Sequence, residues 1–464
     1  MGTSTSSEAA KTEPPAAPPR AAAAPEEKKP SYWEQASDGY EQLVNAIIRP
    51  PRAEYEDAHL GPREFKFAGR QFRRRDFNLR NERGMKIVCS HWEPFDRERR
   101  AAELPCIVYM HGNSSARVEA VPQLSLALSL GATLLAFDFT GSGQSDGEYV
   151  SLGFFEREDL KAVIQHLRSS ARVSTVALWG RSMGAATSLM HGDRDPSIAA
   201  MVLDSPFADL TQLAEEMVDK GREQGLVVPG FVVSIAISFL RGSVKKNAGF
   251  NIKDISPIKR VDQCFIPALF VAGEGDDFIH PRHSQMIHAK YSGDKNLVMV
   301  EGDHNSPRPR FLYDSAAIFL QTYLQISPEW ALTEVDPFNG GYPPWVSRGV
   351  FAMRPNIEFE EDGDGEENGQ GVFEPSSVDL NDGVHLGMTA ERQMQTQRAL
   401  LSMLGGGGGG SAGEKNYTAE VPTNNFPVSA IKEWPCGVVR NHMHMPPHPI
   451  SSSNFDLPCS CSAR

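Results

Sequence analysis

The part of the sequence that most constrains the fold is the pentapeptide G-R-S-M-G at positions 180–184. It follows a short apolar run, Thr175 to Trp179, and precedes Ala185 to His191, which is compatible with a helix. A serine on such a strand-to-helix turn has a strained backbone, so the positions two residues away on either side must be almost free of side chain. Glycine at both ends of the pentapeptide meets this requirement. An ordinary surface serine without a function would not require two glycines between a strand and a helix. We therefore interpret Ser182 as a nucleophile.

The sequence around this pentapeptide alternates short apolar runs with helix-like segments from Phe65 onward. Such alternation predicts a mostly parallel sheet covered by helices on both faces. The first two runs, joined through Asn81 to Gly84, are expected to form an antiparallel start to the sheet. The expected strands are Met85–Trp92, Cys106–Met110, Thr133–Phe139, Thr175–Trp179, Ala199–Leu203, Ala268–Ala272 and Leu297–Val300.

The composition changes at both ends of the alternating region. We expect one domain at residues 31–328, opened by a helix at Tyr32 to Ile48, within the chain of 464 residues. Residues 1–30 are too poor in apolar side chains to offset the entropy of ordering, and we interpret them as a disordered leader. Residues 329–464 contain an acidic stretch and a glycine run, which predicts a low-complexity, largely disordered tail.

Two polar loops follow expected strands later in the chain. Asp276 comes after Ala268 to Ala272, and His304 comes after Leu297 to Val300. A general base needs a pKa near the working pH, which favours histidine, and a carboxylate must orient it. We therefore interpret His304 as the base and expect the acid in the loop that holds Asp276. The neighbouring alternatives are Glu274, Asp277, His280, His283 and His288.

An oxyanion formed by attack of the serine needs two backbone donors. One comes from the residue after the nucleophile, here Met183, and the other from a loop after an earlier strand. The expected strand Cys106 to Met110 runs directly into H-G-N-S at 111–114. We expect the amide of Asn113 to be the second donor.

These segments together resemble the α/β-hydrolase superfamily, and within it the serine aminopeptidase-like, Bem46-like and depalmitoylase-like hydrolases. The resemblance covers roughly residues 55–325, and it implies that Asp276, fourth in its loop from Gly273, is the acid. It also implies hydrolysis of an ester, thioester or amide through an acyl-enzyme, which needs no metal or organic cofactor. The matching segments are Y-M-H-G-N at 109–113, F-D-F-T-G-S-G-Q-S at 137–145, the pentapeptide, and the loops at 273–276 and 302–304.

Many relatives carry a sizeable helical cap, whereas Ser205 to Asp262 leaves room here for a small cap or none. We interpret the apolar segment Val227 to Leu240 as a core helix packed on the sheet. The alternative is a surface that lines an acyl-binding groove or touches a membrane. A small cap would leave the site open to large substrates such as an acylated protein.

Three functions fit these features. The leading hypothesis is a serine hydrolase that acts on an acyl ester, a thioester or an acylated protein. A serine peptidase of the same fold is the alternative within the same chemistry. A non-catalytic interaction protein on a hydrolase scaffold is the alternative from another class, and the presence of all three triad residues argues against it.

The net charge and the targeting patterns limit the partners and the cellular locations that we expect. The net charge of −13 argues against nucleic acid as a partner. The first 30 residues contain no apolar secretory segment, so we expect an intracellular, cytoplasmic protein. The first six residues fit the pattern for N-myristoylation of Gly2, which together with a second signal would give peripheral membrane contact. The cysteines Cys89, Cys106 and Cys264 fall in or next to expected strands, and no disulfide framework is implied.

Overall fold

The computed structural model describes residues 2, 40–41, 44–223, 230–332 and 343–346, with side chains at all of these except 221–223 and 230–237. The described residues from 40 onward confirm the alternation of strands and helices. The predicted leader, apart from Gly2, and the predicted tail, apart from residues 329–332 and 343–346, lie outside the described residues. Gly2 is exposed, and its myristoylation stays a prediction.

The domain is built on a nine-stranded sheet with the order β1-β2-β3-β5-β4-β6-β7-β8-β9. The first three strands and the contact between β3 and β5 are antiparallel, and the remaining pairs are parallel. The central strands are buried along their whole length, which explains why they occur as continuous apolar runs in the sequence. The strands are β1 Glu64–Phe67, β2 Arg70–Arg80, β3 Lys86–Pro94, β4 Leu104–Met110, β5 Thr133–Phe137, β6 Val173–Arg181, β7 Ala200–Asp204, β8 Ala268–Gly273 and β9 Lys295–Val300.

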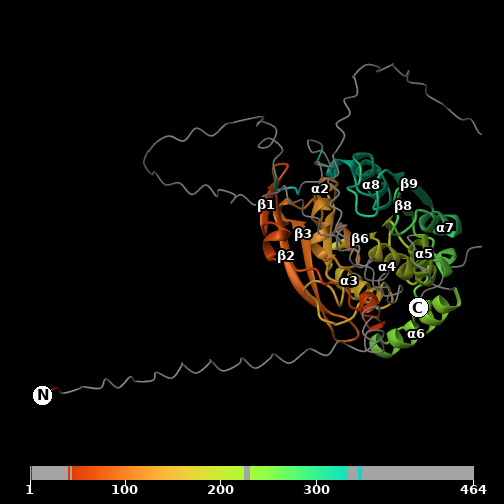
Figure 1. Cartoon of the computed structure of the whole chain (residues 1–464). Helices are drawn as coiled ribbons and strands as arrows, with labels where there is room; N and C mark the ends of the chain where they lie inside the picture. Colours follow the sequence, from red (N-terminus) through yellow and green to blue (C-terminus); the bar gives the residue numbers. More distant parts are fainter. Residues whose placement is uncertain (1, 3–39, 42–43, 224–229, 333–342, 347–464) are drawn as a thin grey trace, which may run out of the picture. The chain divides into compact units, whose positions relative to one another are not determined.

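Helices cover both faces of the sheet (Figure 1). Helices α2 and α8 pack against one apolar cluster on one face of the sheet. Helices α3, α4 and α7 pack against a second apolar cluster on the other face. The α-helices are α2 Leu124–Ser129, α3 Glu156–Ser169, α4 Met183–Gly192, α5 Leu210–Glu223, α6 Gly230–Ala248, α7 Arg282–Lys290 and α8 Arg310–Tyr323. The short 3₁₀ helices are η1 Asp57–Leu60, η2 Asp96–Glu98, η3 Arg117–Gln123, η4 Ile252–Asp254, η5 Pro257–Lys259, η6 Val261–Gln263 and η7 Pro328–Trp330.

The start of the sheet is antiparallel as predicted, but the pairing predicted for it was wrong. The turn at 81–84 connects β2 to β3, where the Asn81 side chain accepts hydrogen bonds from the amides of Arg83 and Met85, each 3.0 Å long. β3 does not pair with β4, because β5 lies between them, antiparallel to β3 and parallel to β4. A strand that arrives later in the chain therefore separates the two runs that are neighbours in sequence.

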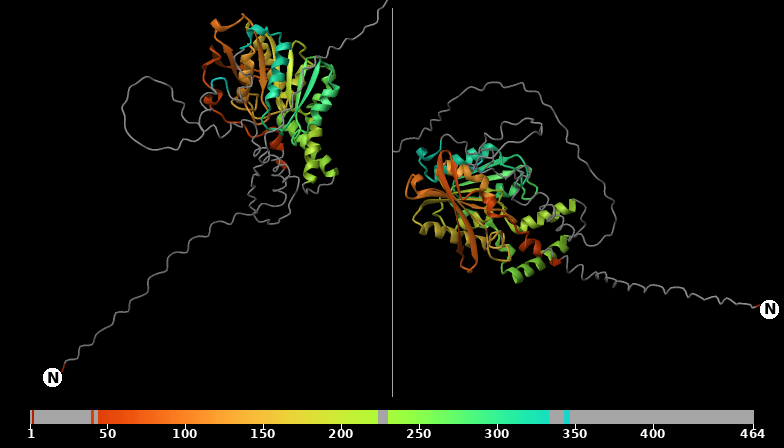
Figure 2. Two further views of the ribbon diagram at one scale, coloured as in Figure 1. Left: turned by 90° about the horizontal axis from the view of Figure 1, so that it is seen from above. Right: turned by 90° about the vertical axis from the view of Figure 1, so that its left-hand side faces the viewer.

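The segment between β7 and β8 forms two helices, α5 and α6, which agrees with a small cap. Figure 2 shows them together at one edge of the domain, near the N-terminal segment 44–48, which is also helical. Most of the segment Val227 to Leu240, which we interpret as a core helix on the sheet, lies outside the residues with described side chains. In the described part of α6, the buried residues Leu240 and Val244 join a cluster with Val44 and Ile48 that contains no strand residue. Among the described helices, none is long and apolar enough to cross a membrane.

Candidate active site

Ser182 lies in a sharp turn between β6 and α4. Its φ of 53° and ψ of −113° fall in a region that residues with a side chain rarely adopt, and its amide donates to the carbonyl of Asp204, 2.7 Å away. A Cβ on Gly180 would overlap the backbone of Gly184, and a Cβ on Gly184 would overlap the Met110 carbonyl, both well inside the 3.0 Å that real Cβ contacts keep. The two glycines are therefore required by close backbone packing, as the sequence predicted.

The serine is hydrogen-bonded into a chain with the two other predicted residues. Ser182 Oγ lies 3.1 Å from His304 Nε2, and His304 Nδ1 lies 2.7 Å from Asp276 Oδ2. All three residues are buried. Since the carboxylate can only accept, Nδ1 carries a proton and Nε2 is free to accept the proton of the serine hydroxyl.

The acid loop after β8 fixes the orientation of Asp276. Its Oδ1 accepts hydrogen bonds from the amides of Phe278 and Ile279, at 3.0 and 2.8 Å, which leaves Oδ2 to face the histidine. The Phe278 ring lies against the His304 ring, with 5.2 Å between their centroids. A residue of the acid loop thus lies against the histidine ring.

The alternatives considered for the acid and the base have other positions. Glu274 is exposed, and Asp277 forms an ion pair with Lys220 on α5. His283 is buried, accepts from the Ala208 amide through Nδ1 and lies 2.9 Å from Glu216 through Nε2. This histidine therefore connects α7 to α5 and lies outside the serine's hydrogen-bonded chain.

The loop after β4 borders the serine. His111 Nε2 accepts from the Phe139 amide at 3.1 Å, so its Nδ1–H donates to the Gly112 carbonyl at 2.7 Å and fixes the start of the loop. A Cβ built on Gly112 would lie 3.8 Å from the Cβ of Ser182, so the loop backbone passes close to the nucleophile. Asn113 follows directly. Met183 is the first residue of α4, where amides lack a partner within the helix.

A largely but not fully buried arginine next to the serine was missed by the sequence analysis. Arg181 Nη2 donates to the carbonyl of His304 at 2.9 Å, and its Nη1 lies 3.8 Å from Glu119 Oε1. Glu119 in turn accepts from the Gly112 amide and from the Tyr109 hydroxyl. Burial lowers the pKa of Arg181, but Glu119 and Asp204 outweigh it and hold this pKa above its ordinary value. Arg181 therefore links the histidine loop to the loop after β4.

A second buried arginine holds the histidine loop from its other side. Arg308 forms a two-pronged ion pair with Asp204, with Nε–Oδ2 and Nη2–Oδ1 distances of 2.9 and 2.8 Å. Arg308 Nη1 also donates to the Asp303 carbonyl at 3.0 Å. Burial raises the pKa of Asp204, but Arg308 outweighs burial and keeps this pKa below its ordinary value. The sequence offers little signal for this pair: Asp204 follows an expected strand directly, but Arg308 comes four residues after His304.

Among the residues with described positions, no group of three or more His, Cys, Asp or Glu side chains is arranged to hold a metal ion. Cys89, Cys106 and Cys264 are buried free thiols, as expected from their places in or next to strands.

The sheet order, the strand–serine–helix turn and the helices on both faces of the sheet are those of the α/β-hydrolase fold. Residues 106–256 match the family model of serine aminopeptidase, S33. The chain thus has the α/β-hydrolase fold and is similar in this region to the S33 family.

Known relatives cover part of the chain. It is 29% identical over 202 residues to the uncharacterized protein YqkD of Bacillus subtilis, which covers 43% of this chain and 64% of that protein. It is 26% identical over 203 residues to the uncharacterized protein YfhR of Escherichia coli, with 43% and 62% covered. The matches thus span less than two thirds of these relatives. A solved structure, the Pyrococcus furiosus esterase Pf2001, is 19% identical with a TM-score of 0.44, and the match covers 60% of this chain and all of that one.

Proposed function

We propose that this protein hydrolyses an acyl ester or thioester through Ser182, His304 and Asp276. The observation that carries the proposal is the continuous hydrogen-bonded chain from Ser182 Oγ to the Asp276 carboxylate, built on a strained turn. Backbone strain of this kind concentrates at functional sites, and the order nucleophile, acid, histidine along the chain is that of α/β-hydrolases.

The proposed reaction has two halves. His304 Nε2 accepts the proton of Ser182 as Oγ attacks the substrate carbonyl, and the amides of Met183 and Asn113 stabilise the oxyanion. The protonated histidine, stabilised by Asp276, then gives its proton to the leaving alcohol or thiol. Water repeats the sequence on the acyl-enzyme and releases the acid.

An ester or thioester fits the site better than a peptide with a free amino terminus. An aminopeptidase needs an acceptor for the substrate's ammonium group. The carboxylates that flank the turn in the described structure, Glu119 and Asp204, are already bound by Tyr109 and Arg308. The alternative, a serine peptidase, is favoured only by the name of the matching family model.

A fluorophosphonate probe, followed by a substrate series, tests the proposal. The wild-type chain should be labelled and Ser182→Ala should not, while Ser205→Ala, a control at a second buried serine near the turn, should keep the label. The substrates are p-nitrophenyl esters and acyl-thioesters of increasing chain length, with aminoacyl p-nitroanilides beside them.

Each result has one meaning. Turnover of esters or thioesters that disappears in Ser182→Ala supports the proposal, and a preference for long chains extends it to lipid esters and acylated proteins. Turnover of only the anilides would assign the peptidase function instead. A correctly folded wild-type chain that neither reacts with the probe nor turns over any substrate would leave the non-catalytic interaction protein as the function to pursue.

A further inference from the structure

The segment that contains α6 has a charge opposite to that of the whole chain. The sequence between Glu223 and Asp254 holds no acidic residue, whereas the complete chain carries a net charge of −13. Its cations are Arg241, Lys245, Lys246 and Lys253. This local excess of positive charge gives one edge of the domain an electrostatic character of its own.

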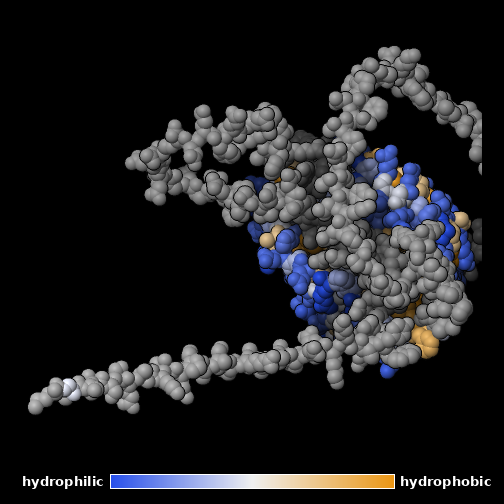
Figure 3. Space-filling model, viewed as in Figure 1, coloured by the Kyte–Doolittle hydropathy of each residue, from blue (hydrophilic) through white to orange (hydrophobic). Residues whose placement is uncertain are grey.

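The outer side of α6 exposes both apolar and basic groups. Phe239 is 67% exposed, and Lys246, two helical turns further on, lies on the same side of the helix. Lys245 and Lys246 are exposed and form no ion pair with any residue whose position is described. Figure 3 shows hydrophobic surface, in orange, at the place that α6 occupies in Figure 1. We call the set Phe239, Gly242, Lys245 and Lys246 the α6 face.

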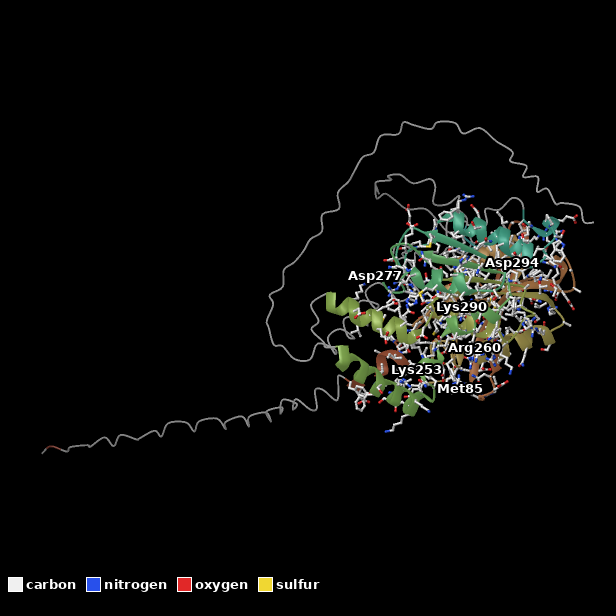
Figure 4. All side chains as sticks on the ribbon, turned by 90° about the vertical axis from the view of Figure 1, so that its right-hand side faces the viewer. Met85, Lys253, Arg260, Asp277, Lys290 and Asp294 are labelled. Atoms are coloured by element: carbon white, nitrogen blue, oxygen red, sulfur yellow. The ribbon has the colours of Figure 1, made fainter. Side chains whose placement is uncertain are left out.

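Two neighbouring features extend this surface. Figure 4 shows Lys253, which is also exposed, close to the end of α6. Phe239 and Gly242 border an open hollow of about 620 Å³. Among the described residues nearby, Glu41 on the N-terminal helical segment and Asp254 next to Lys253 are acidic, so the four cations of the α6 segment remain in excess.

The inner side of α6 connects this surface to the candidate site. Leu240 and Val244 pack in the same apolar cluster as Ala186 of α4, four residues after the serine, and Ile279 of the acid loop. On α5, Lys220 pairs with Asp277, which is labelled in Figure 4 and directly follows the proposed acid. The α6 face therefore lies on the outside of a packed unit whose inside borders the serine and the acid.

We propose that the α6 face docks on the surface of an anionic lipid bilayer. Phe239 enters the boundary between head groups and acyl chains, and Lys245, Lys246 and Lys253 lie against lipid phosphates and carboxylates. A helix with an exposed aromatic ring, basic neighbours and no acidic residue has the composition of interfacial helices. An acidic protein partner would pair with the lysines, but it would not explain why the aromatic ring of Phe239 is exposed between small side chains. The docking itself does not depend on the function proposed above. Its consequence, that lipid-borne acyl groups come close to Ser182, does rest on that function.

Vesicle co-sedimentation of full-length Ser182→Ala tests the docking without catalysis. Protein made in bacteria lacks N-myristoylation, so binding does not depend on an acyl chain at Gly2. The vesicles contain phosphatidylcholine either alone or mixed with phosphatidylserine. We expect strong binding only to the mixed vesicles, weakened by added salt, since basic residues near an anionic surface act through a screened attraction.

Two variants and two matched controls locate the contact. Lys245→Gln/Lys246→Gln should lower the partition coefficient about thirtyfold, from about 1 kcal/mol for each basic residue near the surface. Phe239→Ser should lower it about tenfold, through loss of the apolar side chain from the interface. The controls, Lys66→Gln/Arg100→Gln and Phe265→Ser, remove exposed groups elsewhere on the domain and should leave binding unchanged. Thermal unfolding by circular dichroism verifies that each variant is folded.

Three outcomes would overturn the proposal. The first is equal binding to neutral and mixed vesicles. The second is an equal loss of vesicle binding in the control variants and in the variants of the α6 face. The third is an absence of vesicle binding by the folded chain. If poly-glutamate binds in a manner that needs Lys245 and Lys246 while vesicles do not bind, the α6 face recognises an acidic polypeptide and not a membrane. None of these outcomes bears on the catalytic proposal, because Ser182 is absent from the test protein.

Discussion

Replacing Asp204 by Asn should destabilise the domain strongly, although the two side chains have nearly the same size. Asp204 and Arg308 form a two-pronged ion pair in which the side chains are only 7% and 8% exposed. Removal of one partner from a buried pair costs about 3–5 kcal/mol, because the other charge stays buried without compensation. Asn can still accept one hydrogen bond from Arg308, so we expect a loss near the lower end, about 3 kcal/mol.

The pH dependence of this loss follows from the pKa of Asp204, which Arg308 lowers against the effect of burial. A carboxylate whose pKa is lower in the folded state contributes stability above its unfolded pKa of about 3.9, and this contribution disappears as the pH falls through the folded value. The stability difference between wild type and Asp204→Asn should therefore be full at pH 7 and should shrink on the acid side of pH 4.

Urea unfolding at pH 7 measures the effect, with Arg308→Leu and the double variant completing a double-mutant cycle. We expect the double variant to lose clearly less stability than the sum of the losses in the two single variants, because each single substitution already removes the interaction between the two side chains. A loss below about 1 kcal/mol in Asp204→Asn would mean that the pair behaves like an exposed one. Strict additivity of the two substitutions would refute the coupling.

Three further predictions test the site and its support. Gly184→Ala should abolish fluorophosphonate labelling, because the added methyl group overlaps the Met110 carbonyl, whereas Gly242→Ala, whose methyl group meets open space, should not. Arg181→Lys should lower kcat about tenfold or more with little change in KM, because an ammonium group cannot reach both partners of the guanidinium and the histidine loop loses its alignment. Burial lowers the pKa of His91 to about 4, so stability should fall by about 3 kcal/mol between pH 6.5 and 4 as the unfolded chain alone takes up the proton, and His91→Gln should flatten this dependence in acid-unfolding curves.

The strands near the site could be predicted because their burial is nearly complete. Segments such as β5 and β7 must be apolar on both faces, so each occurs as a short uninterrupted run. The candidate site residues followed from the same regularity, since parallel strands end at one edge of the sheet and their following loops meet there. The serine turn added a purely local constraint, the two glycines.

β2 could not be predicted from its apolar residues, because it carries arginines at buried and half-buried positions. Arg74 is only 4% exposed, and it forms ion pairs with Asp57 from η1 and Asp76 from its own strand. An arginine is buried only when such partners are in place, and the partner on η1 comes close only in the folded chain. The same reasoning explains why the pairing of β3 with β5 escaped prediction: the sequence marks strands but not their neighbours.

The arginines beside the serine, like the arginine of β2, depend on partners that are distant in the sequence. Their arrangement also explains why charged side chains are buried at this site. Arg181 lies directly before the nucleophile, and the residues that it reaches belong to η3 and to the loop after β9. An apolar side chain would fill the same space, but it would not fix the direction of the His304 carbonyl. A proton transfer over 3.1 Å tolerates little rotation of the histidine, so a donor aimed at its backbone is worth the cost of burying a charge. Because the glutamate that holds Arg181 also accepts from the Gly112 amide, a shift of either loop is resisted by the other.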